Sequence, residues 1–237
     1  MTSNAVNNRG FISAGADDID RTIGGGIPYG TLMLIEGDGG SGKSTLAQQF
    51  LWGALESGEK AAVYTTEQTV STLIRQGASL GLDVRDHFLL GHLQIYPVSI
   101  PPGSIAPALM FQELSAHLRR QEASRVMVID SLTTFVSNAG GDQIQEFFGR
   151  CKSLCDQGKV IICTVHSEAF DPGILTRVRS ICDGHLRLRV EKSGSQLQKI
   201  LEVAKMRGAD MATGNIAAFE VEPISGIRIV PISRARA

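Results

Sequence analysis

The sequence predicts an α/β fold in which a mainly parallel central sheet is covered by helices on both faces. Three observations support this prediction. Segments with strand character alternate with segments of helical periodicity along most of the chain. The central strand segments are apolar throughout, as is typical of strands buried on both faces. Near the end, apolar and charged residues alternate in successive strand segments, which predicts an antiparallel C-terminal extension on one sheet edge.

The first half of the chain is expected to begin with a tail and then to alternate between helices and strands. Residues 1–10 are polar and lack periodicity, so they predict a disordered tail, and residues 11–237 are expected to form a single domain. A short helix at Asp17–Ile23 should end at the glycine run that follows it. The next expected elements are a strand at Thr31–Glu36, a helix at Lys43–Glu56, a strand at Lys60–Thr66, a helix at Val70–Leu80 and a strand at Leu93–Val98.

The second half continues this alternation and then changes character. A helix is expected at Pro107–Gln121, with proline in its first turn. It is followed by a strand at Arg125–Ile129, a helix at Ile144–Asp156 and a strand at Lys159–Val165. The antiparallel extension is expected to comprise Leu186–Val190, a turn at Ser193–Ser195, and strands at Leu197–Ala204, Ile216–Val221 and Gly226–Ile232.

Charge, hydrophobic content and the length of apolar runs argue against several classes of protein. The 237 residues include 23 Lys and Arg against 24 Asp and Glu, a net charge of −1, which argues against a generally basic nucleic-acid binder. Hydrophobic residues make up 43% of the chain, enough for a sizeable core. No apolar run approaches the roughly 18 residues that span a bilayer, and the N-terminus lacks the pattern of a secretion signal. We therefore expect a cytoplasmic protein with no direct membrane insertion.

The cysteines fit that compartment. Cys151 and Cys155 lie one helical turn apart and could in principle be two metal ligands. They also continue an apolar stripe that includes Ile144, Phe147 and Leu154 at helical spacing. This pattern favours buried thiols that act as small hydrophobic groups over a metal site or a disulfide.

A glycine-rich segment carries the clearest chemical signal. It consists of Gly37, Asp38, Gly39, Gly40, Ser41, Gly42, Lys43 and Ser44, and it matches G-x-x-x-x-G-K-[ST] between an expected strand and an expected helix. Glycines allow the backbone to wrap a phosphate, while N–H groups and the helix N-terminus supply positive charge. Lys43 is expected to bridge the β- and γ-phosphates of ATP, Ser44 to ligate Mg²⁺, and Thr45 to lie near the α-phosphate.

Polar residues after other strands complete the expected site. Asp130 ends the apolar run Val126–Ile129, so it should lie at the carboxyl edge of the sheet and hold Mg²⁺, through a water molecule. Glu67 follows the strand at Lys60–Thr66 and is a candidate catalytic base, although it could instead serve the N-terminus of the next helix, with Thr69 as cap. His166 ends another strand and could sense the γ-phosphate, or be structural.

With these residues in place, the chain resembles the RecA/KaiC branch of P-loop ATPases. The entry segment Gly24–Gly30 and the late pair Lys205 and Arg207 match that branch in position and spacing. The resemblance implies a RecA/KaiC-like P-loop fold. It also implies that Lys205 and Arg207 reach the γ-phosphate held by a neighbouring subunit, as an arginine finger does. The alternative interpretation of the pair, which we favour less, is an exposed basic strand end.

More specific stretches resemble the archaellum ATP-binding (FlaH/ArlH) family. They are residues 65–70, 82–86, 88–91, 93–97, 179–183, 201–205, 213–215 and 233–237. This resemblance implies an ATP-binding regulatory subunit of the archaeal swimming motor, located in the cytoplasm at the periphery of the membrane-embedded motor. It further implies a homo-oligomer, a hexameric ring, that docks onto the motor ATPase inside a membrane-associated ring scaffold.

One departure bears on activity. KaiC domains carry two adjacent carboxylates where this chain has Glu67 and Gln68, and a glutamine side chain does not take a proton. We therefore predict firm ATP binding with slow hydrolysis, so that nucleotide occupancy is a switch rather than the source of power. Two alternatives stay open. One is a KaiC-like autophosphorylating ATPase or kinase in another signalling role. The other is a RecA-type DNA-dependent ATPase, which the lack of Lys and Arg in residues 138–142 disfavours.

Overall fold

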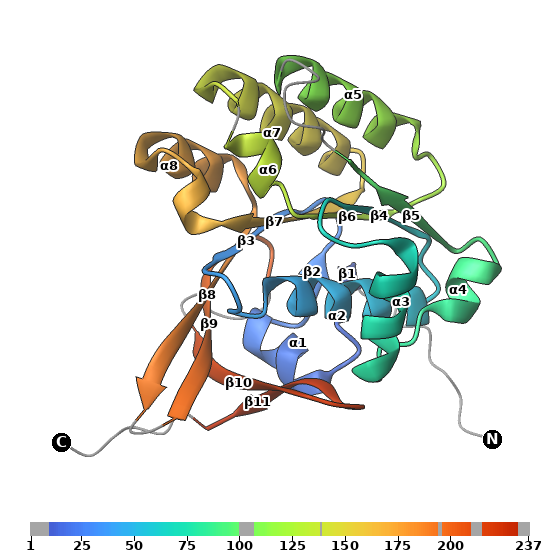
Figure 1. The fold of residues 1–237 in the computed structure, drawn as a ribbon, viewed down its shortest axis with the longest axis vertical. Coiled ribbons are helices and arrows are strands. Elements are labelled where there is room, and N and C mark those ends of the chain that lie inside the picture. The colour runs from blue at the N-terminus through green and yellow to red at the C-terminus, as the bar shows by residue number, and fades with distance from the viewer. Residues whose placement is uncertain (1–9, 100–106, 138, 194–195, 210–214, 232–237) are drawn as a thin grey trace.

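The computed structural model describes residues 10–99, 107–137, 139–193, 196–209 and 215–231 (Figure 1). Within these ranges one sheet has the strand order β11-β10-β9-β8-β3-β7-β6-β4-β5. Its strands are β3 (Leu32–Gly37), β4 (Ala61–Thr65), β5 (Leu93–Pro97), β6 (Val126–Asp130), β7 (Val160–His166), β8 (Gly184–Ser193), β9 (Gln196–Met206), β10 (Ile216–Glu222) and β11 (Gly226–Val230). Two short strands, β1 (Phe11–Ile12) and β2 (Ile27–Pro28), pair separately.

The sheet is parallel from β5 through to β8 and antiparallel from β8 to β11. Both the parallel core and the antiparallel extension on one side of it are therefore confirmed. Because the strands from β3 to β5 all run in the same direction, their carboxyl ends meet at one edge, which is where open α/β sheets bind ligands.

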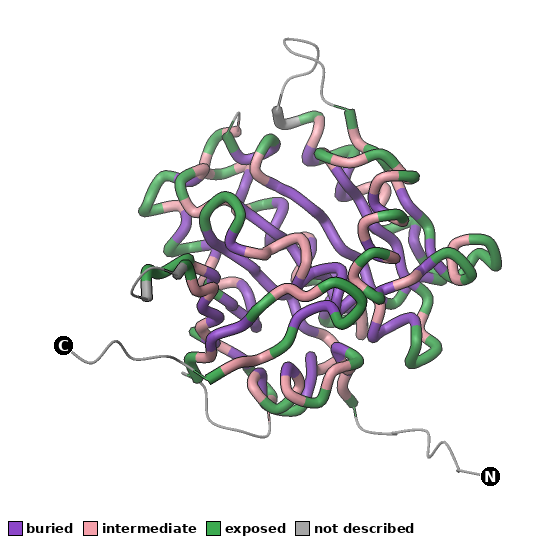
Figure 2. Tube along the Cα trace, turned by 60° about the horizontal axis from the view of Figure 1, so that its bottom comes forward, coloured by how far each residue is buried: buried purple, intermediate pink, exposed green. Residues whose placement is uncertain are grey.

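Helices cover both faces of the sheet (Figure 1). They are α1 (Asp17–Ile23), α2 (Lys43–Glu56), α3 (Val70–Ser79), α4 (Arg85–Leu89), α5 (Pro107–Arg120), α6 (Thr133–Val136), α7 (Gly141–Cys155) and α8 (Pro172–Ile181). One apolar cluster joins the sheet to α1 and α2, and a second joins its other face to α5 and α7. Figure 2 shows the buried strands running between these layers.

Most element boundaries agree with the expectations within one or two residues. The helices α1 and α2 have the expected ends, and Thr69 caps α3 by accepting a hydrogen bond from the N–H of Thr72. Helix α7 begins three residues earlier than expected, at Gly141, because the Gln143 side chain accepts a hydrogen bond from the N–H of Gly140 and stabilises the extra turn. Of the tail expected at residues 1–10, residues 1–9 lie outside the described residues, as do residues 194–195 of the expected turn.

Three helices were missed, for local reasons. α4 has five residues and buries none of them, so it leaves no apolar periodicity. α6 has only four residues. The start of α8 reads Asp171, Pro172 and Gly173, which is typical of a turn. In the structure Asp171 is the N-cap, its side chain accepts a hydrogen bond from the N–H of Gly173, and Pro172 is the first residue of the helix.

The cysteines are as expected. Cys151, Cys155, Cys163 and Cys182 are free and buried, and burial raises the pKa of each thiol.

Among the described residues, no group of three or more His, Cys, Asp or Glu side chains could hold a metal ion. In the same part of the chain, no helix is long and apolar enough to cross a membrane.

Candidate functional site

The carboxyl edge of the sheet brings the predicted site residues together. In the parallel register, Gly37 at the end of β3 pairs with His166 on β7, and Thr65 at the end of β4 pairs with Asp130 on β6. A pocket of about 410 Å³ lies at this edge. It is lined by Gly39, Gly40, Gly42, Lys43, Ser44, Thr45, Glu67, Asp130, Ser131, Thr133, His166, Lys199 and Val221.

The glycine-rich loop has the shape that its sequence predicts. Gly42 precedes α2 with φ of 99°, a left-handed conformation that favours glycine. A Cβ on Gly37 would lie 2.1 Å from the carbonyl oxygen of Leu188, so a side chain there would push β8 away from the root of the loop. Inside the loop, Ser41 Oγ donates to the carbonyl oxygen of Asp38 at 2.8 Å. This bond braces the loop internally, and neither Asp38 nor Ser41 lines the pocket.

The Lys43 ammonium lies over the loop. Its Nζ donates to the carbonyl oxygens of Gly37 at 2.9 Å and Asp38 at 2.7 Å. Burial lowers the pKa of Lys43, while the nearby carboxylates of Asp130 and Glu67 oppose that shift. The residue thus presents a positive charge between the loop carbonyls and the carboxylates on the other side of the pocket.

Asp130 contacts two hydroxyl groups. Ser44 Oγ donates to Asp130 Oδ1 at 3.0 Å, and Thr164 Oγ1 donates to the same oxygen at 2.5 Å. Burial raises the pKa of Asp130, and the two hydroxyl donors partly offset that shift. A carboxylate and a serine hydroxyl side by side are hard oxygen donors, so these residues fit a Mg²⁺ ion.

Glu67 lies across the pocket, where the sequence predicts it. Its Oε1 accepts a hydrogen bond from Ser131 Oγ at 3.2 Å. The third strand-end residue, His166, also lines the pocket, and its backbone N–H donates to Thr133 Oγ1 at 3.0 Å.

Sequence reasoning missed four lining residues. Ser131 directly follows Asp130, so a hydroxyl next to a strand-end carboxylate was a signal that could have identified it, and Thr133 lies two residues further on. Lys199 and Val221 come from β9 and β10 in the antiparallel extension. The local sequence does not indicate that these strands pass close to the loop. The structure shows that they do, because a Cβ on Gly42 would lie 3.1 Å from the Phe219 ring on β10.

Lys205 and Arg207 do not line the pocket of their own chain. Lys205 Nζ donates to the carbonyl oxygens of Arg179, Ser180 and Cys182, at the C-terminal end of α8. Arg207 forms an ion pair with Asp183, with 3.5 Å between Nη1 and Oδ1. Within one chain, therefore, this pair binds the end of α8 and the segment that follows it.

Comparison with known proteins agrees with this geometry. A family model described as a KaiC ATPase matches residues 12–234. The archaeal flagellar ATP-binding protein FlaH of Sulfolobus acidocaldarius is 35% identical over 231 residues, which cover 96% of this chain and 100% of that protein. FlaH of Methanocaldococcus jannaschii is 29% identical over 222 residues, 92% of this chain and 94% of that one.

A solved structure supports the same assignment. The crystal structure of the flagellar accessory protein FlaH from Methanocaldococcus jannaschii superposes with a TM-score of 0.80 at 26% identity, covering 94% of this chain and 99% of that one. The circadian clock oscillator protein KaiC of Parathermosynechococcus lividus is 26% identical, but this chain spans only 41% of its length. The chain therefore belongs to the KaiC ATPase family and, within it, to the archaeal flagellar ATP-binding (FlaH) family.

Proposed function

We propose that this chain binds ATP with Mg²⁺ in the pocket at the carboxyl edge of the sheet and serves as a nucleotide-dependent accessory subunit of the archaellum motor. One observation carries the proposal. Lys43, Ser44, Asp130 and Glu67 converge on a single pocket, in a chain that is 35% identical over nearly its full length to a flagellar ATP-binding protein.

Each group has a distinct part in binding. The loop N–H groups, the N-terminus of α2 and the Lys43 ammonium supply positive charge to the phosphates. Ser44 and Asp130 hold Mg²⁺, Asp130 through a water molecule. When bound, the ion neutralises charge on the phosphate oxygens. Thr45 lies on the pocket wall, in the first turn of α2. We propose that it lies near the α-phosphate of bound ATP.

Glu67 is the proposed base for slow hydrolysis. Its carboxylate takes a proton from a water molecule, whose oxygen forms a bond to the γ-phosphorus while the bond from that phosphorus to the β–γ bridging oxygen breaks, leaving ADP and phosphate. The adjacent Gln68 has no proton-accepting carboxylate. Its amide instead donates to Gln76 on α3 at 2.6 Å. A single carboxylate at this position is consistent with slow turnover and with nucleotide occupancy acting as a switch.

The finer part of the proposal concerns assembly. We propose a hexameric ring that docks onto the motor ATPase and a membrane-associated scaffold, with Lys205 and Arg207 contributing to the neighbouring subunit's site. The Arg207 side chain is 58% exposed and so is accessible to a neighbour. Lys205 would have to leave the carbonyl oxygens at the end of α8 to do the same.

The direct test compares Lys43→Ala with Lys60→Ala. Lys60 is exposed and precedes β4, at the opposite end of that strand from the pocket. In calorimetric titrations with ATP and Mg²⁺, Lys43→Ala should weaken binding by on the order of 100-fold, because a charge contact to phosphate is lost, while Lys60→Ala should bind as the unmodified chain does. Light scattering with the motor ATPase should then show ATP-dependent assembly for Lys60→Ala alone. If Lys43→Ala binds ATP and assembles normally, the proposal is wrong.

A further inference from the structure

The Ser131 hydroxyl accepts a hydrogen bond from one neighbouring group and donates a hydrogen bond to another. The backbone N–H of Thr133 donates to Ser131 Oγ at 3.3 Å, and Ser131 Oγ donates to Glu67 Oε1 at 3.2 Å. A hydroxyl has a single proton to give. Because the Thr133 amide already supplies a proton to this oxygen, the proton of Ser131 is directed at the Glu67 carboxylate.

The backbone of Ser131 is fixed as well. Its N–H donates to Thr66 Oγ1 at 3.2 Å, and the same Thr66 hydroxyl donates to the carbonyl oxygen of Ser131 at 3.2 Å. The N–H of Thr66 donates to the carbonyl oxygen of Asp130 at 3.1 Å. These bonds tie the segment after β4 to the segment after β6, and Ser131 itself is only 4% exposed.

Glu67 has no such restraint from its own segment. It is an exposed residue between β4 and α3, and an exposed glutamate side chain has several rotamers available to it. The hydrogen bond from Ser131 fixes one carboxylate oxygen, Oε1, at the wall of the pocket. Because one oxygen of the carboxylate is fixed, the orientation of its other oxygen, Oε2, is restricted as well.

We propose that Ser131 is a positioning residue that orients the Glu67 carboxylate for the hydrolysis of ATP. The proposal rests on the proposed function, because it needs Glu67 to act as the base. A hydrogen bond to a charged group is among the stronger ones, and a misplaced general base loses much of its effect. The proposal therefore predicts a loss of turnover without a matching loss of ATP affinity.

The experiment is a double-mutant cycle of Ser131→Ala and Glu67→Gln, with ATP affinity and single-turnover hydrolysis both measured. Ser131→Ala should lower the rate by about 10-fold or more and leave ATP affinity within about twofold. In the Glu67→Gln background, Ser131→Ala should lower the rate no further, since the group through which it acts is gone. A purely structural role for Ser131 would lower the rate in both backgrounds.

Ser137→Ala is the matched control. It removes a hydroxyl from the same segment, where Ser137 Oγ donates to the carbonyl oxygen of Thr133, and the residue is exposed. Its rate should equal that of the unmodified chain, and thermal melts should show every variant folded. Additive rate losses in the cycle, an unchanged rate for Ser131→Ala, absence of turnover in the unmodified chain, or phosphate covalently bound to Ser131 in mass spectra would each overturn the inference. Failure of the unmodified chain to bind ATP would instead refute the proposed function.

Discussion

Two buried carboxylates near the carboxyl edge of the sheet have opposite surroundings. Glu36, on β3, is 1% exposed, and Asp130, at the end of β6, is 7% exposed. Glu36 lies next to two arginines and a histidine, whereas Asp130 contacts the hydroxyls of Ser44 and Thr164. In the described part of the chain, no lysine, arginine or histidine forms an ion pair with Asp130.

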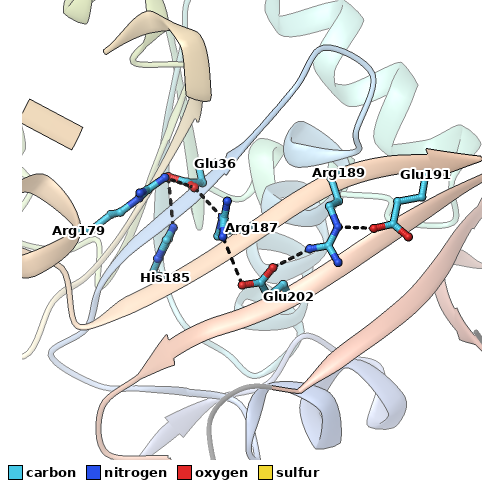
Figure 3. Close-up of polar contacts among 7 residues, drawn as sticks. All are labelled: Glu36, Arg179, His185, Arg187, Arg189, Glu191 and Glu202. Carbon is cyan, nitrogen blue, oxygen red and sulfur yellow. Dashed lines mark hydrogen bonds and ion pairs between the residues drawn. The ribbon is translucent and has the colours of Figure 1, made fainter. Parts of the chain in front are cut away.

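The Glu36 cluster joins three elements to the root of the glycine-rich loop (Figure 3). Arg179 on α8 donates from Nε to Glu36 Oε2 at 3.0 Å and from Nη2 to Oε1 at 2.6 Å. From β8, Arg187 Nε lies 3.0 Å from Oε1, and His185 Nε2 lies 3.3 Å from Oε2. Arg187 also contacts Glu202 on β9, which extends the cluster to the antiparallel strands.

These surroundings shift the pKa values of Glu36 and Asp130 in opposite directions. Burial alone would raise the pKa of Glu36, but hydrogen bonds and charge from His185 and Arg179 together lower it to about 2. Burial also raises the pKa of Asp130, and neutral hydroxyl donors do not reverse that shift. The difference indicates that Glu36 has its counter-ions within the fold and serves structure, whereas Asp130 is suited to an external cation such as Mg²⁺.

The largest expected effect comes from removing the Glu36 charge. Glu36→Gln leaves two arginines without their buried carboxylate, so the free energy of unfolding should fall by about 3 kcal/mol. Asp130→Asn, measured without nucleotide, should change it by less than about 1 kcal/mol, because no ion pair is lost. Urea denaturation of both variants checks this contrast. Equal losses for the two variants would contradict the distinction between a structural acid and a binding acid.

The same comparison shows what sequence can predict here. Glycine spacing and the polar residue at the end of each apolar strand are local signals, so they are enough to assign Lys43, Ser44, Asp130 and Glu67 to one edge of the sheet. The Glu36 cluster has no local signal, because Arg179 lies 143 residues away on α8, a helix whose start is typical of a turn. Lys199 and Val221 were missed for a related reason: the course of β9 and β10 past the loop depends on long-range strand pairing.

Acid should remove the stabilisation that Glu36 provides. Its folded pKa of about 2 lies below the ordinary value of 4.5, so its contribution is complete above pH 4.5 and is lost as pH falls toward 2. The difference in unfolding free energy between the unmodified chain and Glu36→Gln should therefore shrink by about 2 kcal/mol between pH 6 and pH 3. Urea titrations across that range measure it, and a difference that grows as pH falls would show that the sign is wrong.

A third prediction concerns the cation that Asp130 is proposed to hold. Asp130→Asn should reduce the gain in ATP affinity produced by Mg²⁺ by at least about tenfold, since a neutral amide is a poorer ligand than a carboxylate. Glu36→Gln, studied at a temperature where it remains folded, should keep that gain. Titrations with ATP in the presence of Mg²⁺ and in the presence of a chelator give both values. If Mg²⁺ strengthens ATP binding to Asp130→Asn as much as to the unmodified chain, Asp130 is not a metal ligand.

The smallest expected effect tests whether the Glu36 cluster extends to Lys205. Lys205 Nζ donates to the carbonyl oxygen of Arg179, the residue that binds Glu36 through two nitrogens, and to that of Ser180. Lys159 is a matched control, because its Nζ donates to three carbonyl oxygens after α5, far from this cluster in the sequence. Replacing either lysine with methionine should lower the free energy of unfolding by about 1 kcal/mol, the usual worth of such bonds.

The two variants should differ in their response to nucleotide. If Lys205 also serves a neighbouring subunit, Lys205→Met should slow ATP turnover or weaken ATP-dependent assembly at concentrations where copies associate, while Lys159→Met should do neither. The comparison is made by light scattering and phosphate release over a range of protein concentrations. Identical behaviour of the two variants would assign Lys205 to the support of Arg179 and Glu36 alone. The stabilising cluster around Glu36 would then be separate from the binding chemistry at Asp130, as their opposite pKa shifts suggest.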